Sequence, residues 1–240
     1  VVQTEYKRIE DALVRVLRSD RRVAQKILSA YLNLLTVYPD QPYDQKSIFY
    51  PDSDEPIVEP ENIGDADTLG EKEQKTLELV KAAIQNGERA LIYTSWVRTD
   101  SQQKLKKLLT DEGYRTEILT DKIRTTDRED WVQKKLAAGM QVLIVNPSLV
   151  ETGLDLNAFT TLVFYSMGYK LFTLRQASRR SWRINQKAPA VKVYMLYYED
   201  TMQQKCLKLM ASKLAVAGLI EGSFSEEGPV SYTHLRAHET

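Results

Sequence analysis

Apolar and polar positions change their spacing along the chain, and these changes divide it into three parts. Residues 1–45 carry apolar side chains at helical intervals, which predicts a helical segment that ends near Pro39 and Pro42. Residues 46–70 lose this periodicity and become acidic and rich in proline, which predicts a linker or loop. The two expected helical stripes consist of Ile9, Leu13, Val16 and Leu17, and of Ala24, Ile27, Leu28, Tyr31, Leu32 and Leu35.

From residue 71 to residue 222, helical patterns alternate with short apolar runs. The runs predict strands over residues 90–94, 115–119, 142–145, 161–165 and 191–196. The intervening patterns predict helices over residues 71–85, 101–109, 126–138 and 171–185, capped by Gly87, Thr126 and Gly139 among others. Such alternation is typical of an α/β fold with a parallel sheet and helices on both faces. Ligands of such sheets bind beyond the carboxyl ends of the strands.

Composition excludes several classes of protein. The 240 residues include 33 Lys and Arg and 33 Asp and Glu, so the formal net charge is zero. No apolar run approaches the roughly 18 residues of a spanning helix, and no secretory leader pattern is visible. We therefore expect a cytoplasmic protein with no membrane partner. Cys206 is the single cysteine, and His234 and His238 are the only histidines, so we expect neither disulfides nor a metal site.

Residues 223–240 are expected to form a disordered tail after the folded part. The last ten residues, 231–240, read SYTHLRAHET and resemble a translated sequencing adapter. We expect this decapeptide to be a non-native artefact, with a native disordered terminus as the alternative. No function is attached to the two histidines that it contains.

Three segments carry candidate chemistry at strand ends. Thr94 and Ser95, followed by Trp96, have hydroxyl groups that can hold a phosphate oxygen. The alternative is a strand that ends in a capping serine. Segment 146–156 contains candidate ligand contacts at Asn146, Ser148, Thr152, Gly153 and Asp155. The alternative interpretation of this segment is a short helix followed by a turn. Segment 176–186 places Arg180 and Arg183 on one helix face, one turn after Gln176. Paired guanidinium groups suit a transferring phosphoryl group, whereas the plain alternative is a solvated basic helix.

These segments, in this order, resemble the motifs of superfamily 2 helicases. Residues 90–96 resemble motif IV, residues 146–156 motif V and residues 176–186 motif VI, whose Q-x-x-x-R-x-x-R-x-x-Q spacing is similar to SNF2-like translocases. The chain thus resembles the C-terminal RecA-like lobe of a helicase or translocase, of the SNF2-like or the DEAD/DEAH type. Arg179, Asn185 and Asp155 depart from the SNF2-like pattern, so the branch stays open.

The resemblance implies roles for the candidate residues. Arg180 and Arg183 would be arginine fingers that reach the γ-phosphate of ATP, and Gln176 would orient them or the attacking water. Gly153 and Asp155 would line the nucleotide. The residues that would face the backbone of DNA or RNA, with DNA as the expected polymer, are Thr94, Ser95, Asn146, Ser148 and Thr152.

The sequence contains no G-x-x-x-x-G-K-[ST] phosphate loop and no acidic magnesium box. ATP and Mg²⁺ would therefore be bound mainly by a first RecA-like lobe, in cis or in trans. We expect the chain to be part of a longer ATP-hydrolysing helicase, or a lone lobe that hydrolyses no ATP at a useful rate by itself. The alternative is a non-catalytic RecA-like module that binds nucleic acid or a protein. An unrelated α/β enzyme is disfavoured by the lack of histidines.

Overall fold

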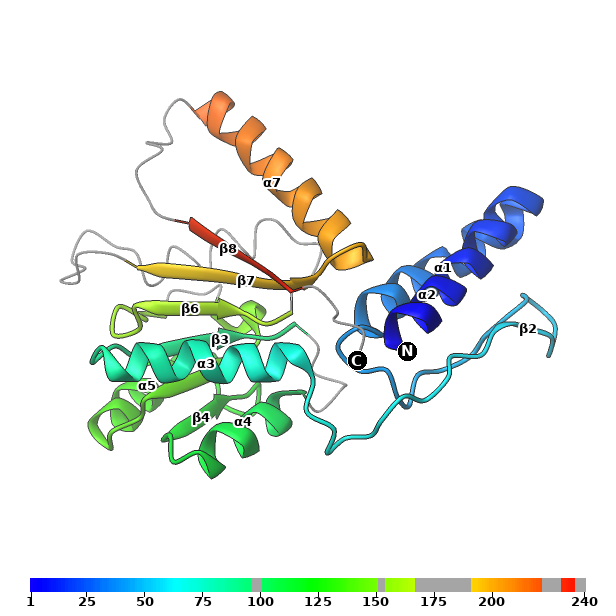
Figure 1. The fold of residues 1–240 in the computed structure, drawn as a ribbon. Helices are drawn as coiled ribbons and strands as arrows, with labels where there is room; N and C mark the ends of the chain where they lie inside the picture. The colour runs from blue at the N-terminus through cyan, green and yellow to red at the C-terminus, as the bar shows by residue number, and fades with distance from the viewer. Residues whose placement is uncertain (96–100, 151–153, 167–190, 222–229, 236–240) are drawn as a thin grey trace. The chain divides into compact units, whose positions relative to one another are not determined.

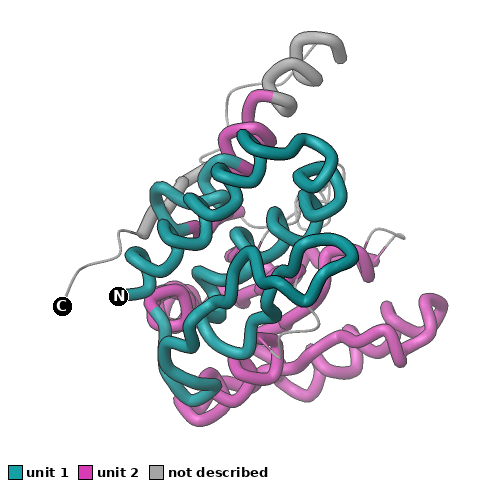
Figure 2. The backbone as a smooth tube through the Cα atoms, turned by 90° about the vertical axis from the view of Figure 1, so that its right-hand side faces the viewer, with its two compact units in different colours: residues 1–70, 198–205, 236–240 teal, residues 71–197, 206–235 magenta. Residues whose placement is uncertain are grey.

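A computed structural model describes residues 1–95, 101–150, 154–166, 191–221 and 230–235, with side chains as far as Ser212. The chain divides into two compact units, which Figure 2 shows in different colours. Unit 1 contains residues 1–70 and 198–205, and unit 2 contains residues 71–197 and 206–235. The boundary between residues 70 and 71 lies where the apolar pattern changes from helical to alternating.

Unit 1 is built on helices α1 (Val2–Ser19) and α2 (Arg21–Val37), which pack against each other. Asp20 alone joins them, and its Oδ1 accepts hydrogen bonds from the backbone N–H groups of Arg22 (2.8 Å) and Val23 (3.1 Å). This contact satisfies two donors at the start of α2. Their apolar stripes form one core, although Leu17 and Leu28 stay 43% and 39% exposed. The core includes Tyr6, Ile9, Leu13, Val16, Ile27, Tyr31, Leu34 and Leu35.

The acidic segment of residues 46–70 packs on these helices, although its composition predicts a linker. Strands β1 (Ile48–Phe49) and β2 (Pro56–Val58) pair in antiparallel fashion. Ile48 and Val58 are buried in the core of unit 1. The backbone N–H of Glu61 donates to Glu5 Oε1 at 2.9 Å, which ties the end of the segment to α1. Buried apolar side chains and hydrogen bonds to α1 therefore hold an otherwise polar segment in place.

Unit 2 contains a twisted sheet with strand order β4-β5-β3-β6-β7-β8. The first five strands of this order are all parallel, and β3 lies between β5 and β6. Figure 1 shows them as a stack of arrows that point the same way. The strands are β3 (Ala90–Tyr93), β4 (Thr116–Leu119), β5 (Val142–Val145), β6 (Thr161–Phe164) and β7 (Lys192–Tyr198). The predicted parallel sheet is confirmed.

Helices cover both faces of this sheet, as predicted. Helices α3 (Glu71–Gln85) and α4 (Ser101–Asp111) pack on the face that contains Ile92, Ile144 and Val163. Helices α5 (Arg128–Ala137) and α7 (Met202–Glu221) pack on the opposite face, with Leu91, Leu143 and Leu162. Alternate side chains of each strand thus enter different cores. Although α7 has 20 residues, no helix in the described ranges is long and apolar enough to cross a membrane.

Three boundaries of unit 2 can be compared with the sequence pattern. Gly87 follows α3 with φ of +72°, the left-handed conformation that glycine adopts most readily. The helix expected from Thr126 begins instead at Arg128, after a short 3₁₀ turn η1 (Thr125–Asp127). The tail expected to be disordered contains strand β8 (Val230–Leu235), which lies beside β7.

Leu91 lies on the central strand and is fully buried. We predict that Leu91→Ala lowers the free energy of unfolding by about 2–5 kcal/mol, because it removes buried methyl groups and leaves a cavity. Urea denaturation checks this value. The exposed substitution Lys134→Ala on α5 should change it by less than about 0.5 kcal/mol, and equal losses in the two variants would contradict the placement of Leu91.

Glu88 joins the amino ends of three strands. Its carboxylate accepts a hydrogen bond from Thr161 Oγ1 at 2.6 Å and pairs with Lys192 Nζ at 2.7 Å. Burial acts to raise the pKa of Glu88, but the hydrogen bonds from Lys192 and Thr161 outweigh it and hold this pKa below its ordinary value of 4.5. A carboxyl group with a lowered pKa contributes stability that is present above its unfolded pKa and is lost as pH falls through its folded pKa.

We predict that wild type is more stable than Glu88→Gln at about pH 7, and that the difference shrinks as the pH falls toward about 3. Urea unfolding midpoints at several pH values measure this trend. A difference that stays constant over the range would show that the Glu88 charge contributes no stability.

Candidate functional site

Polar side chains follow the central strands at the point where each strand ends. Thr94 and Ser95 follow β3, Asn146 follows β5, and Ser166 follows Tyr165 at the end of β6. The strands are in parallel register, with Tyr93 opposite Val145 on one side and Phe164 on the other. The residues after these positions therefore meet at one edge of the sheet, where parallel sheets bind ligands.

Hydrogen bonds connect these strand ends directly. The backbone N–H of Ser95 donates to Ser166 Oγ at 2.8 Å, and Ser95 Oγ donates to the Ser166 carbonyl at 3.2 Å. Asn146 Nδ2 donates to the Ser95 carbonyl at 3.5 Å. We call Ser95, Asn146, Ser148 and Ser166 the carboxyl-edge row. The row spans three adjacent strand ends and contains hydroxyl and amide groups without a formal charge.

Asn146 also holds the turn that follows β5. Its Oδ1 accepts hydrogen bonds from the backbone N–H (3.0 Å) and the Oγ (2.8 Å) of Ser148. This cap begins the 3₁₀ turn η2 (Pro147–Val150), on which Ser148 is exposed. Arg128 from the start of α5 donates to the Leu149 carbonyl at 2.8 Å and to the Ile123 carbonyl at 3.2 Å. The predicted residues Ser95, Asn146 and Ser148 are thus brought together on a braced backbone.

A buried lysine supports the same edge and was not found from the sequence. Lys72, at the start of α3, is 1% exposed, and its Nζ donates to the Tyr165 carbonyl at 3.0 Å. The Nζ also lies 5.5 Å from the centroid of the Tyr165 ring. A charged group is buried only with such partners. Its spacing could have indicated that it is buried, because Lys72 lies on the same face of α3 as the buried residues Thr76 and Val80, one and two helical turns before them.

Thr94 differs from its neighbours because its side chain is fully buried. Its backbone N–H donates to the Val145 carbonyl at 3.1 Å, so it continues the strand pairing. Within the described part of the chain, its Oγ1 has no hydrogen-bond partner. A buried hydroxyl without a partner costs roughly 1–3 kcal/mol, so a ligand or water that reached it would relieve this cost.

Asp155 is fixed on its own turn rather than by the carboxyl-edge row. It is half-buried between the buried Leu154 and Leu156, and its Oδ1 accepts a hydrogen bond from the Asn157 backbone at 3.0 Å. This arrangement holds a carboxylate in place, where it can accept hydrogen bonds from hydroxyl groups. Five of the expected site residues lie outside the described residues: Thr152, Gly153, Gln176, Arg180 and Arg183.

No group of three or more His, Cys, Asp or Glu side chains in the described ranges has the arrangement of a metal site. The described edge of the sheet is a set of hydrogen-bond donors and acceptors, and the fixed carboxylate of Asp155 lies on a separate turn. Such groups can contact a sugar–phosphate backbone without reading its sequence.

Comparisons with known proteins agree with the fold of unit 2. A sequence profile of the family described as "Helicase conserved C-terminal domain" matches residues 71–185. A putative ATP-dependent helicase/translocase, YwqA of Bacillus subtilis (strain 168), is 27% identical over 143 residues, which cover 59% of this chain and 15% of that protein. An uncharacterized ATP-dependent helicase of Mycoplasma pneumoniae is 22% identical over 143 residues, or 59% of this chain and 14% of that protein.

A solved structure has a similar fold. The crystal structure of the C-terminal part of the Fun30 ATPase domain matches with a TM-score of 0.53 and 19% identity, over 59% of this chain and 45% of that one. The match to the two helicases of Bacillus subtilis and Mycoplasma pneumoniae covers only about a seventh of the length of those proteins. Residues 71–185 match the family of helicase conserved C-terminal domains, and unit 2 has the fold of the C-terminal RecA-like lobe of superfamily 2 helicases.

Proposed function

We propose that the chain is the second motor lobe of an ATP-dependent helicase or translocase that acts on nucleic acid, with DNA as the polymer. The observation that carries this proposal is the carboxyl-edge row, which joins three strand ends at the ligand-binding edge of a helicase-family lobe. A first RecA-like lobe, in cis or in trans, would complete the motor. The cytoplasm is the compartment where we expect it to act.

The row suits contact with a sugar–phosphate backbone. Ser95, Ser148 and Asn146 carry hydroxyl and amide donors, and donors of this kind make sequence-independent contacts with phosphates. Asn146 and Arg128 hold η2 through hydrogen bonds, so the backbone near Ser148 is set before a ligand arrives. Preorganised donors avoid the entropy cost of ordering on binding. Thr152 belongs to the same proposed interface.

Lys72 has a positioning role in this proposal. Its bond to the Tyr165 carbonyl fixes the end of β6, directly before Ser166 in the row. Beyond Ser166 the chain leads to Gln176, Arg180 and Arg183. Holding the start of this segment would limit the positions that its guanidinium groups can reach.

The nucleotide would contact this lobe through few groups. Arg180 and Arg183 would stabilise the charge that develops on the transferring phosphoryl group, and Gln176 would orient them or the attacking water. Gly153 and Asp155 would border the nucleotide, and the fixed Asp155 carboxylate fits a ribose hydroxyl as its partner. ATP and Mg²⁺ would be held mainly by the first lobe.

We predict that Arg180→Ala in the intact two-lobe protein reduces ATP turnover by about 10³-fold or more, because an arginine finger contributes about 10³–10⁵ in turnover. Nucleic-acid affinity should change little, because the row is left intact. Steady-state ATPase rates with saturating DNA, together with DNA affinity, measure both effects.

The matched control for Arg180→Ala is Lys81→Ala, which removes an exposed cation near the far end of α3. Its turnover should equal wild type. If Arg180→Ala keeps more than about a tenth of wild-type turnover, the finger assignment is wrong. The lobe would then serve as a non-catalytic module that binds nucleic acid or a protein.

We predict that Thr94→Val raises the free energy of unfolding by up to about 1–3 kcal/mol, because it removes a buried hydroxyl that has no described partner and keeps the side-chain shape. Affinity for DNA should fall about tenfold or more, since one hydrogen bond to a charged group contributes about 1.5–3 kcal/mol. Thr94→Ser, which keeps the hydroxyl, should retain wild-type affinity. Unchanged DNA affinity in Thr94→Val would remove Thr94 from the interface.

A further inference from the structure

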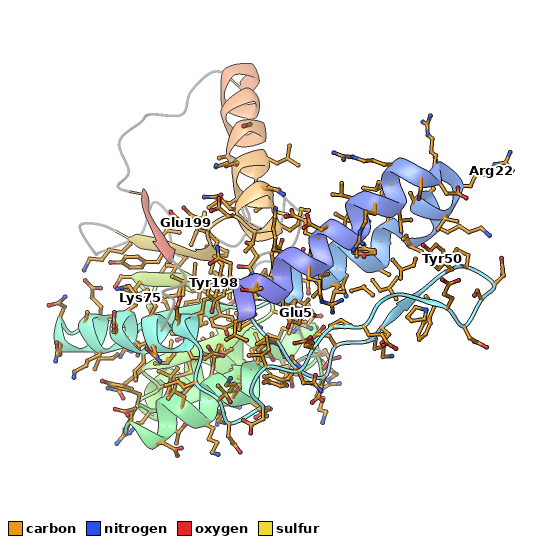
Figure 3. All side chains as sticks on the ribbon, turned by 45° about the vertical axis from the view of Figure 1, so that its right-hand side comes forward. Glu5, Arg22, Tyr50, Lys75, Tyr198 and Glu199 are labelled. Atoms are coloured by element: carbon orange, nitrogen blue, oxygen red, sulfur yellow. The ribbon has the colours of Figure 1, made fainter. Side chains whose placement is uncertain are left out.

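The turn between α1 and α2 carries a concentrated positive charge. Residues 15–26 contain five cations and one carboxylate, Asp20. All five cations are exposed. Figure 3 shows Arg22 at the end of the helical pair, pointing away from it. We call this set of side chains the hairpin tip; it consists of Arg15, Arg18, Arg21, Arg22 and Lys26.

The charges of the hairpin tip are not neutralised locally. Asp20 Oδ1 accepts hydrogen bonds from two backbone N–H groups at the start of α2. In the described ranges, no carboxylate forms an ion pair with Arg18, Arg21 or Arg22. Lys26 alone has one, with Asp52 at 3.4 Å, and both side chains of that pair are largely exposed. An exposed pair of this kind contributes little.

The cations in the other half of α1 are paired with carboxylates. Lys7 pairs with Glu10 at 3.2 Å, and Arg8 pairs with the buried Glu5 at 2.6 Å. Glu10 also pairs with Lys205 at 2.6 Å. Lys7 and Arg8, near the amino end of α1, therefore each have a carboxylate partner. In the hairpin tip, only Lys26 forms an ion pair with a carboxylate among the described residues.

The chemistry of the tip fits a chain of phosphates. Four of its five cations are arginines, whose planar guanidinium groups bind phosphate through two parallel hydrogen bonds. Arg15 and Arg18, and Arg22 and Lys26, are each about one helical turn apart, or about 5 Å along the axis. A single phosphate cannot engage them all, whereas a nucleic-acid backbone presents a charge every few ångströms.

An anionic membrane fits less well. A helix that lies on a membrane needs an exposed apolar face. Here the apolar faces of α1 and α2 are buried against each other, and Leu17 and Leu28 are the only large apolar side chains of these helices that count as exposed.

We propose that the hairpin tip is a second binding surface for nucleic-acid backbone, separate from the carboxyl-edge row. It contains no residue of the RecA-like lobe and requires no role for ATP. It shares with the proposed function only the class of ligand. Its contacts are sequence-independent, and they weaken as salt concentration rises.

The acidic turn between β1 and β2 limits this surface. Asp52 occupies the turn with φ of 64°, and its carboxylate contacts Lys26. Because asparagine also tolerates positive φ, Asp52→Asn removes the charge and keeps the turn. The variant leaves Lys26 without its acidic partner and therefore raises the affinity of the tip for phosphates.

The test uses the full chain and a fluorescein-labelled DNA duplex of about 20 base pairs, with anisotropy titrations between about 50 and about 200 mM NaCl. The double variant Arg18→Gln/Arg22→Gln lowers affinity about tenfold and reduces the slope of log affinity against log salt by about 2, because each phosphate contact contributes about 0.9. Asp52→Asn raises affinity about twofold. The matched control Lys81→Gln/Lys134→Gln removes two exposed cations from unit 2 and changes affinity less than about twofold.

Equal losses in the two double variants, or no change in slope, would overturn the proposal, provided that circular dichroism shows both variants folded. Loss of binding to phosphatidylserine vesicles in the tip variant, with DNA affinity unchanged, would also overturn it and indicate an anionic membrane instead. Thr94→Val separates this proposal from the proposed function. If Thr94→Val keeps its DNA affinity and the tip variant loses it, Thr94 is removed from the lobe interface and the proposal for the hairpin tip is supported.

Discussion

Parallel hydrogen bonding of β3 to β5 on one side and to β6 on the other is the constraint on which the rest of unit 2 depends. Parallel strands cannot be joined by tight turns, so each connection must cross over the sheet. Here α4 lies in the connection from β3 to β4 and α5 in the connection from β4 to β5, and they cover opposite faces of the sheet. The same constraint brings the ends of β3, β5 and β6 to one edge. The polar residues that follow these strands therefore lie close together in space, although they are far apart in the sequence.

The edge would be a row of separate polar side chains if nothing connected it. Ser95 and Ser166 exchange two hydrogen bonds, and Asn146 extends this connection to the end of β5. Lys72 adds a charged donor from a helix on one face of the sheet. Because this donor is buried, its removal would leave the Tyr165 carbonyl without that partner. Rigidity at the edge thus arises from a few polar contacts on top of a fully apolar sheet.

Zero net charge over the whole chain hides an uneven distribution of charge. Glu88 and Glu117 pair with lysines in unit 2, and Glu5 and Glu10 pair with cations in unit 1. Hydrogen bonds and the charges of these partners hold the pKa values of all four carboxyl groups below their ordinary value, against the effect of burial. In the hairpin tip, by contrast, Arg18, Arg21 and Arg22 lie close together in sequence and have no carboxylate partner among the described residues. Local pairing, rather than composition, therefore decides where a polyanion would be attracted.

The sequence by itself determined the parallel α/β fold, because near-continuous apolar runs separated by helical patterns are compatible with few other arrangements. It also placed Ser95, Asn146 and Ser148 at the ends of strands, since strand ends can be located from the runs. The burial of Lys72 and Thr94, the packing of residues 46–70 and strand β8 were decided only by the tertiary structure. From sequence alone, a lysine such as Lys72 is expected to be exposed, and the acidic residues 46–70 are expected to form a loop. Their burial and packing depend on partners that are distant in the sequence. Leu17 and Leu28 fit a helical stripe yet stay exposed, because the width of a buried stripe depends on the neighbouring helix and not on the pattern.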